Sequence, residues 1–202
     1  MTLGRLALRA SVGAFFVGHG TQKLFGWFDG HGLEGTGGFF ESLGLEPGKQ
    51  NALAAGVAET AGGALLAAGA LTPVASTLLS STMLTAARTA HKGKGPWVTA
   101  GGWEYNVVLT AAVTALAETG PGSLSVDERV FPNFKGAHWA AMSLGAAALG
   151  TYLATSGRLP MGSDVPADEA APVSSHDEDG RFARPDHEAS GSSEETVASP
   201  AA

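Results

Sequence analysis

The sequence contains no cysteine. Disulfide bonds, thiol relays, thiolate metal sites and cysteine-ligated iron–sulfur clusters are therefore excluded. The chain also lacks a basic run of the kind that binds nucleic acid. It has no Walker loop, dinucleotide-binding fingerprint, serine-hydrolase signature or zinc-protease motif. No common catalytic motif assigns a reaction, so function must be inferred from less specific features.

Charged side chains are scarce in the first three quarters of the chain and concentrated in the last. Residues 1–155 hold nine acids and nine bases, whereas residues 156–202 hold ten acids and three arginines and so supply the net charge of −7. This tail is rich in Ser, Pro, Ala, Asp and Glu, and such a composition buries too little apolar surface to fold. We predict a helical body at residues 1–155 and a disordered acidic tail at residues 156–202.

Long stretches of the body are almost free of charge. Glu59 is the only Asp, Glu, Lys or Arg between Lys49 and Arg88, and none lies between Lys135 and Arg158. Such stretches suit a bilayer core, which takes about 20 apolar residues per helix. We therefore predict an all-α membrane helix bundle with five transmembrane helices, at about residues 3–24, 52–71, 74–90, 104–117 and 136–155. The alternative, a soluble Ala-rich bundle, would usually show a charged face every turn or two.

The residues around these helices indicate how the bundle is packed and oriented. The helices are rich in Ala, Gly, Ser and Thr, which allow helices in lipid to approach closely. The glycine- and aromatic-rich segment 25–51 is predicted to lie at the membrane interface or to fold back on the bundle. Lys and Arg near the membrane number six on the side of segments 25–51, 91–102 and the tail, against four on the other. This difference favours a cytoplasmic location for those segments.

The first predicted helix ends in a polar cluster. His19, Gln22 and Lys23 are spaced i, i+3 and i+4, so they share one helix face. One interpretation is a site that binds a polar head group, a quinone carbonyl or an anion. The other is that these side chains reach from the interface to water, as long basic side chains commonly do.

Glu59 lies eight residues into an otherwise uncharged helix. A carboxylate is costly there, so we expect it to face the bundle interior and to be protonated or paired. It is a candidate proton carrier, with Arg9, Lys23 or Arg88 as possible partners. The alternative is a structural ion pair or hydrogen bond that holds the helices in register.

Two further charged residues stand at helix ends. Arg88, with His91 one turn later, ends the third helix and is predicted to add cations to the polar centre or to form a solvated helix end. Glu104 begins the fourth helix, where an acid also favours the helix N-terminus. The pair His19 and His91 raises haem ligation as a weaker alternative, and no metal site is predicted.

The order of several motifs resembles the DoxX family of small bacterial membrane proteins. The motifs are Arg9, the run His19-Gly20-Thr21-Gln22-Lys23-Leu24-Phe25-Gly26, Gly37, Leu43-Gly44-Leu45, Glu59-Thr60-Ala61-Gly62-Gly63-Ala64-Leu65-Leu66, Glu104-Tyr105-Asn106 and Gly120-Pro121-Gly122-Ser123-Leu124-Ser125-Val126-Asp127. The resemblance covers about residues 3–128. It implies a four-helix core in the bacterial inner membrane, so the fifth helix and the tail depart from the family pattern.

The resemblance implies a role in a redox system. Named relatives include the membrane subunit of a thiosulfate:quinone oxidoreductase and an actinobacterial protein assembled with superoxide dismutase and a sulfurtransferase. The family's polar positions correspond here to His19, Gln22, Lys23, Glu59 and Glu104. We expect Glu59 and His19 to be catalytic, and Gln22, Lys23, Arg88 and Glu104 to bind a substrate or cofactor such as a quinone.

Three functional hypotheses remain open at this stage. The first is a subunit of a quinone-linked oxidoreductase that acts on sulfur compounds or in oxidative stress. The second is a non-catalytic membrane scaffold that anchors soluble redox enzymes, and the third is a transporter of protons or small solutes. The expected partners are the lipid bilayer, a soluble redox protein and further copies of the chain, but no nucleic acid.

Overall fold

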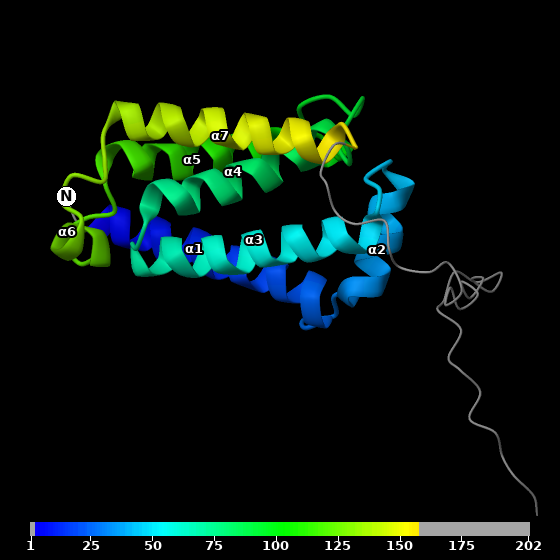
Figure 1. Cartoon of the computed structure of the whole chain (residues 1–202), viewed down its shortest axis with the longest axis horizontal. Coiled ribbons are helices and arrows are strands. Elements are labelled where there is room, and N and C mark those ends of the chain that lie inside the picture. The colour runs from blue at the N-terminus through cyan, green and yellow to red at the C-terminus, as the bar shows by residue number, and fades with distance from the viewer. Residues whose placement is uncertain (1–2, 158–202) are drawn as a thin grey trace, which may run out of the picture. The chain divides into compact units, whose positions relative to one another are not determined.

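The computed structural model describes residues 3–157, which all lie within one compact unit and are entirely helical and loop. The predicted all-α class is therefore confirmed. Figure 1 shows the elements in chain order. They are α1 (Leu3–Phe25), α2 (Gly32–Ser42), α3 (Gly48–Ala68), α4 (Thr72–Arg88), the 3₁₀ turn η1 (Val98–Ala100), α5 (Glu104–Thr119), α6 (Val126–Val130) and α7 (Ala137–Thr155).

The five predicted long helices correspond to α1, α3, α4, α5 and α7. Helix α4 starts at Thr72, and Pro73 lies in its first turn. The backbone N–H groups of a first turn have no partner within the helix, so the missing N–H of proline removes no helical hydrogen bond there. The short helices α2 and α6 were not predicted, because the glycines and aromatics of one and the turn residues of the other hid their helical pattern. The predicted acidic tail lies, apart from Ser156 and Gly157, outside the described residues.

The membrane-spanning character predicted for these helices is not found. No helix within residues 3–157 has both the length and the apolar content that a bilayer crossing requires. Helices α4 and α5 have 17 and 16 residues, whereas a crossing takes about 20. The longer helices contain polar side chains or many small residues that contribute little hydropathy.

Helices α1 and α3 run antiparallel and touch through two pairs of glycines. A β-carbon on Gly13 would lie 2.5 Å from the carbonyl oxygen of Gly63, and one on Gly63 would lie 2.6 Å from that of Gly13. A β-carbon on Gly20 would likewise lie 2.7 Å from the carbonyl oxygen of Gly56. The glycines are seven residues apart in each helix, so both contacts fall on one face and bring the two backbones together.

Helix α2 closes one end of the bundle by packing on the start of α3 (Figure 1). This contact also depends on glycine, because a β-carbon on Gly48 would lie 2.2 Å from the carbonyl oxygen of Gly37. Segment 25–51 therefore folds back on the bundle, as one of the two predictions for it stated, and it does so through the contact between α2 and α3.

Helix α7 lies along α4 and α5 (Figure 1). Ser143 on α7 donates to the Pro73 carbonyl at 2.9 Å, and Thr151 donates to the Ser81 carbonyl at 3.2 Å. Both hydroxyls are buried. The small polar residues of these helices thus hold neighbouring backbones together by hydrogen bonds rather than by large apolar contacts.

The end of the bundle opposite α2 is fixed by buried charges that bind backbone groups. Asp127 is 2% exposed and accepts hydrogen bonds from the Leu71 N–H at 2.6 Å, the Thr72 N–H at 2.8 Å and the Thr72 hydroxyl at 2.6 Å. It thereby satisfies free donors at the N-terminus of α4. Arg9, also buried, donates to the carbonyls of Ala67 and Leu124.

We predict that Gly13→Ala lowers the free energy of unfolding by about 1–3 kcal/mol, the usual cost of overpacking, although alanine favours helix more than glycine does. The physical reason is that the new methyl group would meet the backbone of α3. Thermal unfolding of the detergent-solubilised protein, followed by circular dichroism, measures the change.

Gly18→Ala is the matched control in the same helix, because a β-carbon there meets no atom within 4 Å. Propensity alone should make this variant neutral or up to about 1 kcal/mol more stable. If both substitutions shift the unfolding midpoint alike, the close approach of α1 and α3 is not what distinguishes Gly13.

Candidate functional site

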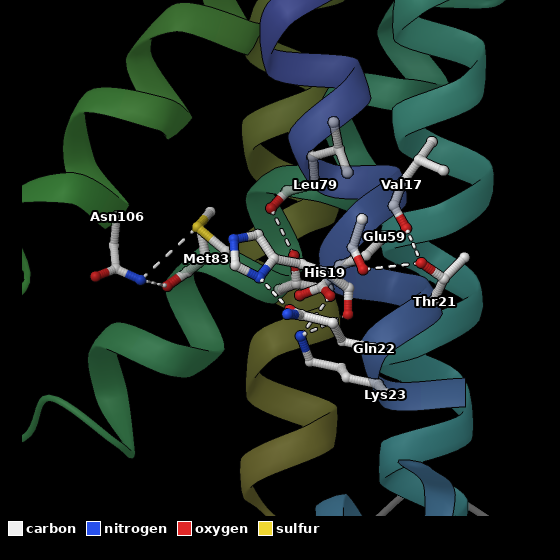
Figure 2. Close-up of polar contacts among 11 residues, drawn as sticks. Val17, His19, Thr21, Gln22, Lys23, Glu59, Leu79, Met83 and Asn106 are labelled. Carbon is white, nitrogen blue, oxygen red and sulfur yellow. Dashed lines mark hydrogen bonds and ion pairs between the residues drawn. The ribbon is translucent and has the colours of Figure 1, made fainter. Parts of the chain in front are cut away.

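An ion pair between α1 and α3 is the centre of the candidate site. The Nζ of Lys23 lies 2.5 Å from Oε2 of Glu59, with side-chain exposures of 23% and 5% (Figure 2). Of the three partners considered for Glu59 from the sequence, the structure selects Lys23. The carboxylate is buried, while the ammonium group keeps one side accessible.

The direction of side chains on antiparallel helices explains why these two residues meet. The glycine contacts place Gly20 of α1 against Gly56 and Thr60 of α3. Lys23 and Glu59 each lie further along their own helix than this contact or close to it, so their Cα atoms are offset along the bundle. Side chains on a helix lean toward its own N-terminus. Lys23 and Glu59 therefore lean toward each other and bridge the offset.

His19 and Gln22 complete the polar cluster predicted on α1. The Nδ1 of His19 lies 3.0 Å from Oε1 of Gln22 (Figure 2). Gln22 Nε2 donates to the Phe28 carbonyl at 3.2 Å. Lys23 Nζ also lies 3.5 Å from the His19 carbonyl oxygen. The cluster thus connects the ion pair to the loop that leads into α2.

A cavity of about 940 Å³ lies beside the ion pair. Its wall is formed by residues of all five long helices and of α2, and it is mostly apolar. His19, Lys23 and Glu59 belong to this wall. A volume near 1,000 Å³ with apolar walls and a few convergent polar groups is typical of sites for small organic ligands.

A second, smaller cavity of about 270 Å³ adjoins the first. It is lined by polar side chains that include Gln22, Asp29 and His31. Four residues line both cavities, namely His19, Lys23, Phe39 and Phe40. The ion pair is therefore bordered by an apolar space on one side and a polar space on the other.

Two of the predicted site residues do not join this cluster. Arg88 is the last residue of α4 and is exposed, and Glu104 is the first residue of α5. Neither lines the two cavities. Both occupy helix ends where their charge complements the helix dipole, which matches the structural interpretation given for each from the sequence.

Two amide residues that line the large cavity, Asn51 and Asn106, were not predicted as site residues. His91, predicted with Arg88 to add a cation to the polar centre or to form a solvated helix end, lines this cavity too. Asn106 is 6% exposed and donates through Nδ2 to the Met83 carbonyl at 3.2 Å. The signal for it was present, because Asn106 belongs to the run Glu104-Tyr105-Asn106. His91 Nδ1 lies 2.6 Å from the Gly101 carbonyl oxygen, so this ring is held by the loop before α5.

The arrangement supports hydrogen bonding and proton exchange with a ligand in the large cavity. An ammonium group donates to a carbonyl oxygen, and a buried carboxylate accepts or returns a proton. Among the described residues, no group of three or more His, Cys, Asp or Glu is placed to hold a metal ion.

These features define a helical bundle with an ion pair buried beside an apolar cavity. Residues 4–92 match the DoxX family model, so this part of the chain is a DoxX domain and the resemblance is confirmed there. The matched region holds α1 to α4 and both partners of the ion pair. No curated protein and no solved structure matches the chain.

We predict that Lys23→Met lowers the free energy of unfolding by up to about 3 kcal/mol, because it leaves the buried Glu59 carboxylate without its partner. Adding Glu59→Leu should recover most of this loss, since the uncompensated charge is then gone. Thermal unfolding of the two single variants and the double variant gives the coupling between the residues.

Lys49→Met is the matched control, because Lys49 pairs with Glu34 at the surface, where the side chains are 59% and 77% exposed. Its effect should stay below about 1 kcal/mol. Equal small losses for Lys23→Met and Lys49→Met would contradict a desolvated pair at Lys23 and Glu59.

Proposed function

We propose that the protein is a membrane-associated component of a quinone-linked redox system, and that the large cavity binds the quinone beside Lys23 and Glu59. The observation that carries this proposal is the ion pair in the wall of a largely apolar cavity of about 940 Å³. A quinone combines an apolar ring with carbonyl oxygens, so it needs apolar walls, a hydrogen-bond donor and a proton-exchanging group at one place.

Membership of the matched region in the DoxX family and the surface of the bundle support association with a lipid bilayer. Large apolar side chains are exposed along the outer faces of the long helices, among them Leu53, Val57, Val108, Met142 and Leu149. Exposed aromatic residues gather in the loops, including Trp27, Phe28, Trp97 and Phe131. Extended apolar surface marks contact with a membrane or a partner, and aromatic rings favour the level of the lipid head groups.

We predict that the full chain co-floats with phospholipid vesicles in a density gradient and stays bound after a high-salt wash and an alkaline carbonate wash. Apolar contact with the acyl chains resists both treatments, whereas attachment by charge alone is screened by salt. Recovery of the protein in the dense fractions after either wash would contradict a bilayer as the partner of the apolar surface.

The chemistry proposed for the cavity assigns a role to each polar residue. Lys23 donates a hydrogen bond to a carbonyl oxygen of the quinone and orients the ring. Reduction to the quinol takes up two electrons from the redox partner and two protons, and Glu59 takes up each proton before it passes that proton to a reduced oxygen. His19, which lines both cavities, returns a proton from the polar cavity to this centre.

The electrons come, in this proposal, from a soluble redox partner that oxidises a sulfur compound or acts in oxidative stress. The chain has no cysteine and no recognisable cofactor motif, so it has no residue pattern of its own for electron transfer. The partner therefore supplies the redox centre, and this chain supplies the quinone site and the attachment to the membrane.

We predict that Glu59→Gln lowers thiosulfate- or sulfide-dependent quinone reduction in membranes by about tenfold or more, at matched protein level. The amide keeps a hydrogen-bonding shape but cannot exchange a proton, and His19→Ala should lower the rate in the same direction. Absorbance of the quinone in membranes with and without the protein follows the reaction.

Glu104→Gln serves as the control, because it removes the same charge from a residue outside both cavities and should leave the rate within about twofold. A rate that depends on the protein but not on Glu59 would contradict the proton role. A redox partner that still binds these membranes without any quinone reduction would favour the scaffold hypothesis instead.

A further inference from the structure

The large cavity is elongated along α1. Its wall on this helix extends from Ser11 to Lys23, a length of about 18 Å at the rise of an α-helix. The ion pair occupies only one stretch of this wall, and most of the remainder is apolar. A ring held at Lys23 and Glu59 would thus leave much of the cavity unfilled, and an attached apolar chain would fill it.

Helices α1 and α5 are joined at one end and separate toward the other. Arg5 on α1 donates to the Thr119 carbonyl at 2.7 Å and the Gly120 carbonyl at 3.2 Å, at the C-terminal end of α5. Elsewhere α1 packs mainly against α3 and contacts α5 only slightly. Figure 1 shows α1 diverging from α5 toward the end closed by α2.

The cavity reaches the surface between these two helices. Phe15 on α1 and Tyr105 on α5 both line the cavity, yet they are 73% and 60% exposed. Ser11, one turn before Phe15, is likewise exposed and lines the cavity. Large apolar side chains that face both a cavity and the surroundings mark an opening that favours an apolar occupant.

We propose that the opening between α1 and α5 is a lateral portal, through which a lipid-soluble quinone with an apolar tail passes from the bilayer into the cavity. The ring lies at Lys23 and Glu59, and the tail leaves past Phe15 and Tyr105. This inference rests on the proposed quinone function and adds to it both the ligand class, a tailed rather than a tail-less quinone, and the route of access.

The absence of cysteine allows a direct test, because an introduced cysteine is the only thiol in the chain. Phe15→Cys places a thiol at the portal. Val57→Cys is the matched control, since Val57 on α3 is 50% exposed and lines neither cavity. Each full-length variant in lipid nanodiscs is labelled with a pyrene maleimide, and binding is measured for decylubiquinone and for the same benzoquinone ring without its tail.

We expect the label on Phe15→Cys to weaken binding of decylubiquinone by about tenfold or more, which corresponds to about 1.4 kcal/mol, and to change binding of the tail-less ring by less than about twofold. The label on Val57→Cys should change neither affinity by more than about twofold. The affinity of each labelled variant is compared with that of the same variant before labelling, and Ser11→Cys replaces Phe15→Cys if the latter fails to fold.

The possible results separate the portal from the function on which it rests. If the unaltered chain binds neither quinone, the proposed function itself is wrong. If it binds both, but the label at Val57→Cys blocks decylubiquinone as strongly as the label at Phe15→Cys, the portal is not between α1 and α5. Equal weakening of both quinones by the label at Phe15→Cys would also overturn the portal, because the tail would then have no special path.

Discussion

The close approach of α1 and α3 determines where the charged groups of the site can meet. Lys23 and Glu59 lie on opposite helices with Cα atoms offset along the bundle, and their side chains bridge this offset across a short distance between the two backbones. The reciprocal contacts Gly13–Gly63 and Gly20–Gly56 provide that distance, because any larger residue would push the backbones apart. Helix α1 packs mainly on α3 and contacts α5 only slightly, and the cavity lies among all five long helices.

Much of the helical architecture could be predicted, because the long helices coincide with the stretches between charged residues. A lack of charge does not describe helix length or hydropathy, and within residues 3–157 no helix reaches the length and apolar content that a bilayer crossing requires. Helix α2 was not predicted, because a glycine such as Gly37 usually indicates a loop. In the structure Gly37 lies within α2 and allows this helix to contact α3 at Gly48. A single sequence does not show whether a glycine serves a turn or a close helix contact.

Helical spacing predicted which polar residues lie together on one helix, but not which residues meet across helices. His19, Gln22 and Lys23 follow from helical spacing, and the structure brings them to Glu59. The partner of Glu59 remained open because Arg9, Lys23 and Arg88 were equally available in sequence. Arg9 is not the partner of Glu59, because it donates hydrogen bonds to the carbonyls of Ala67 and Leu124 at the opposite end of the bundle. The turns after α3 and α5 place these two carbonyls near Arg9. Such long-range placement depends on packing, which local patterns do not describe.

The energetics of the ion pair argue for a role beyond holding the helices together. A buried pair is weak evidence for stability, because its attraction barely repays the loss of hydration, and apolar residues of similar volume often serve as well. The glycine contacts and the buried hydroxyl bonds of α7 already hold the bundle in register without it. What the pair adds is a proton-exchanging carboxylate and a donor at the boundary between an apolar and a polar cavity. Apolar replacements would keep the fold but lose both groups, and this difference makes the pair a better candidate for chemistry than for stability.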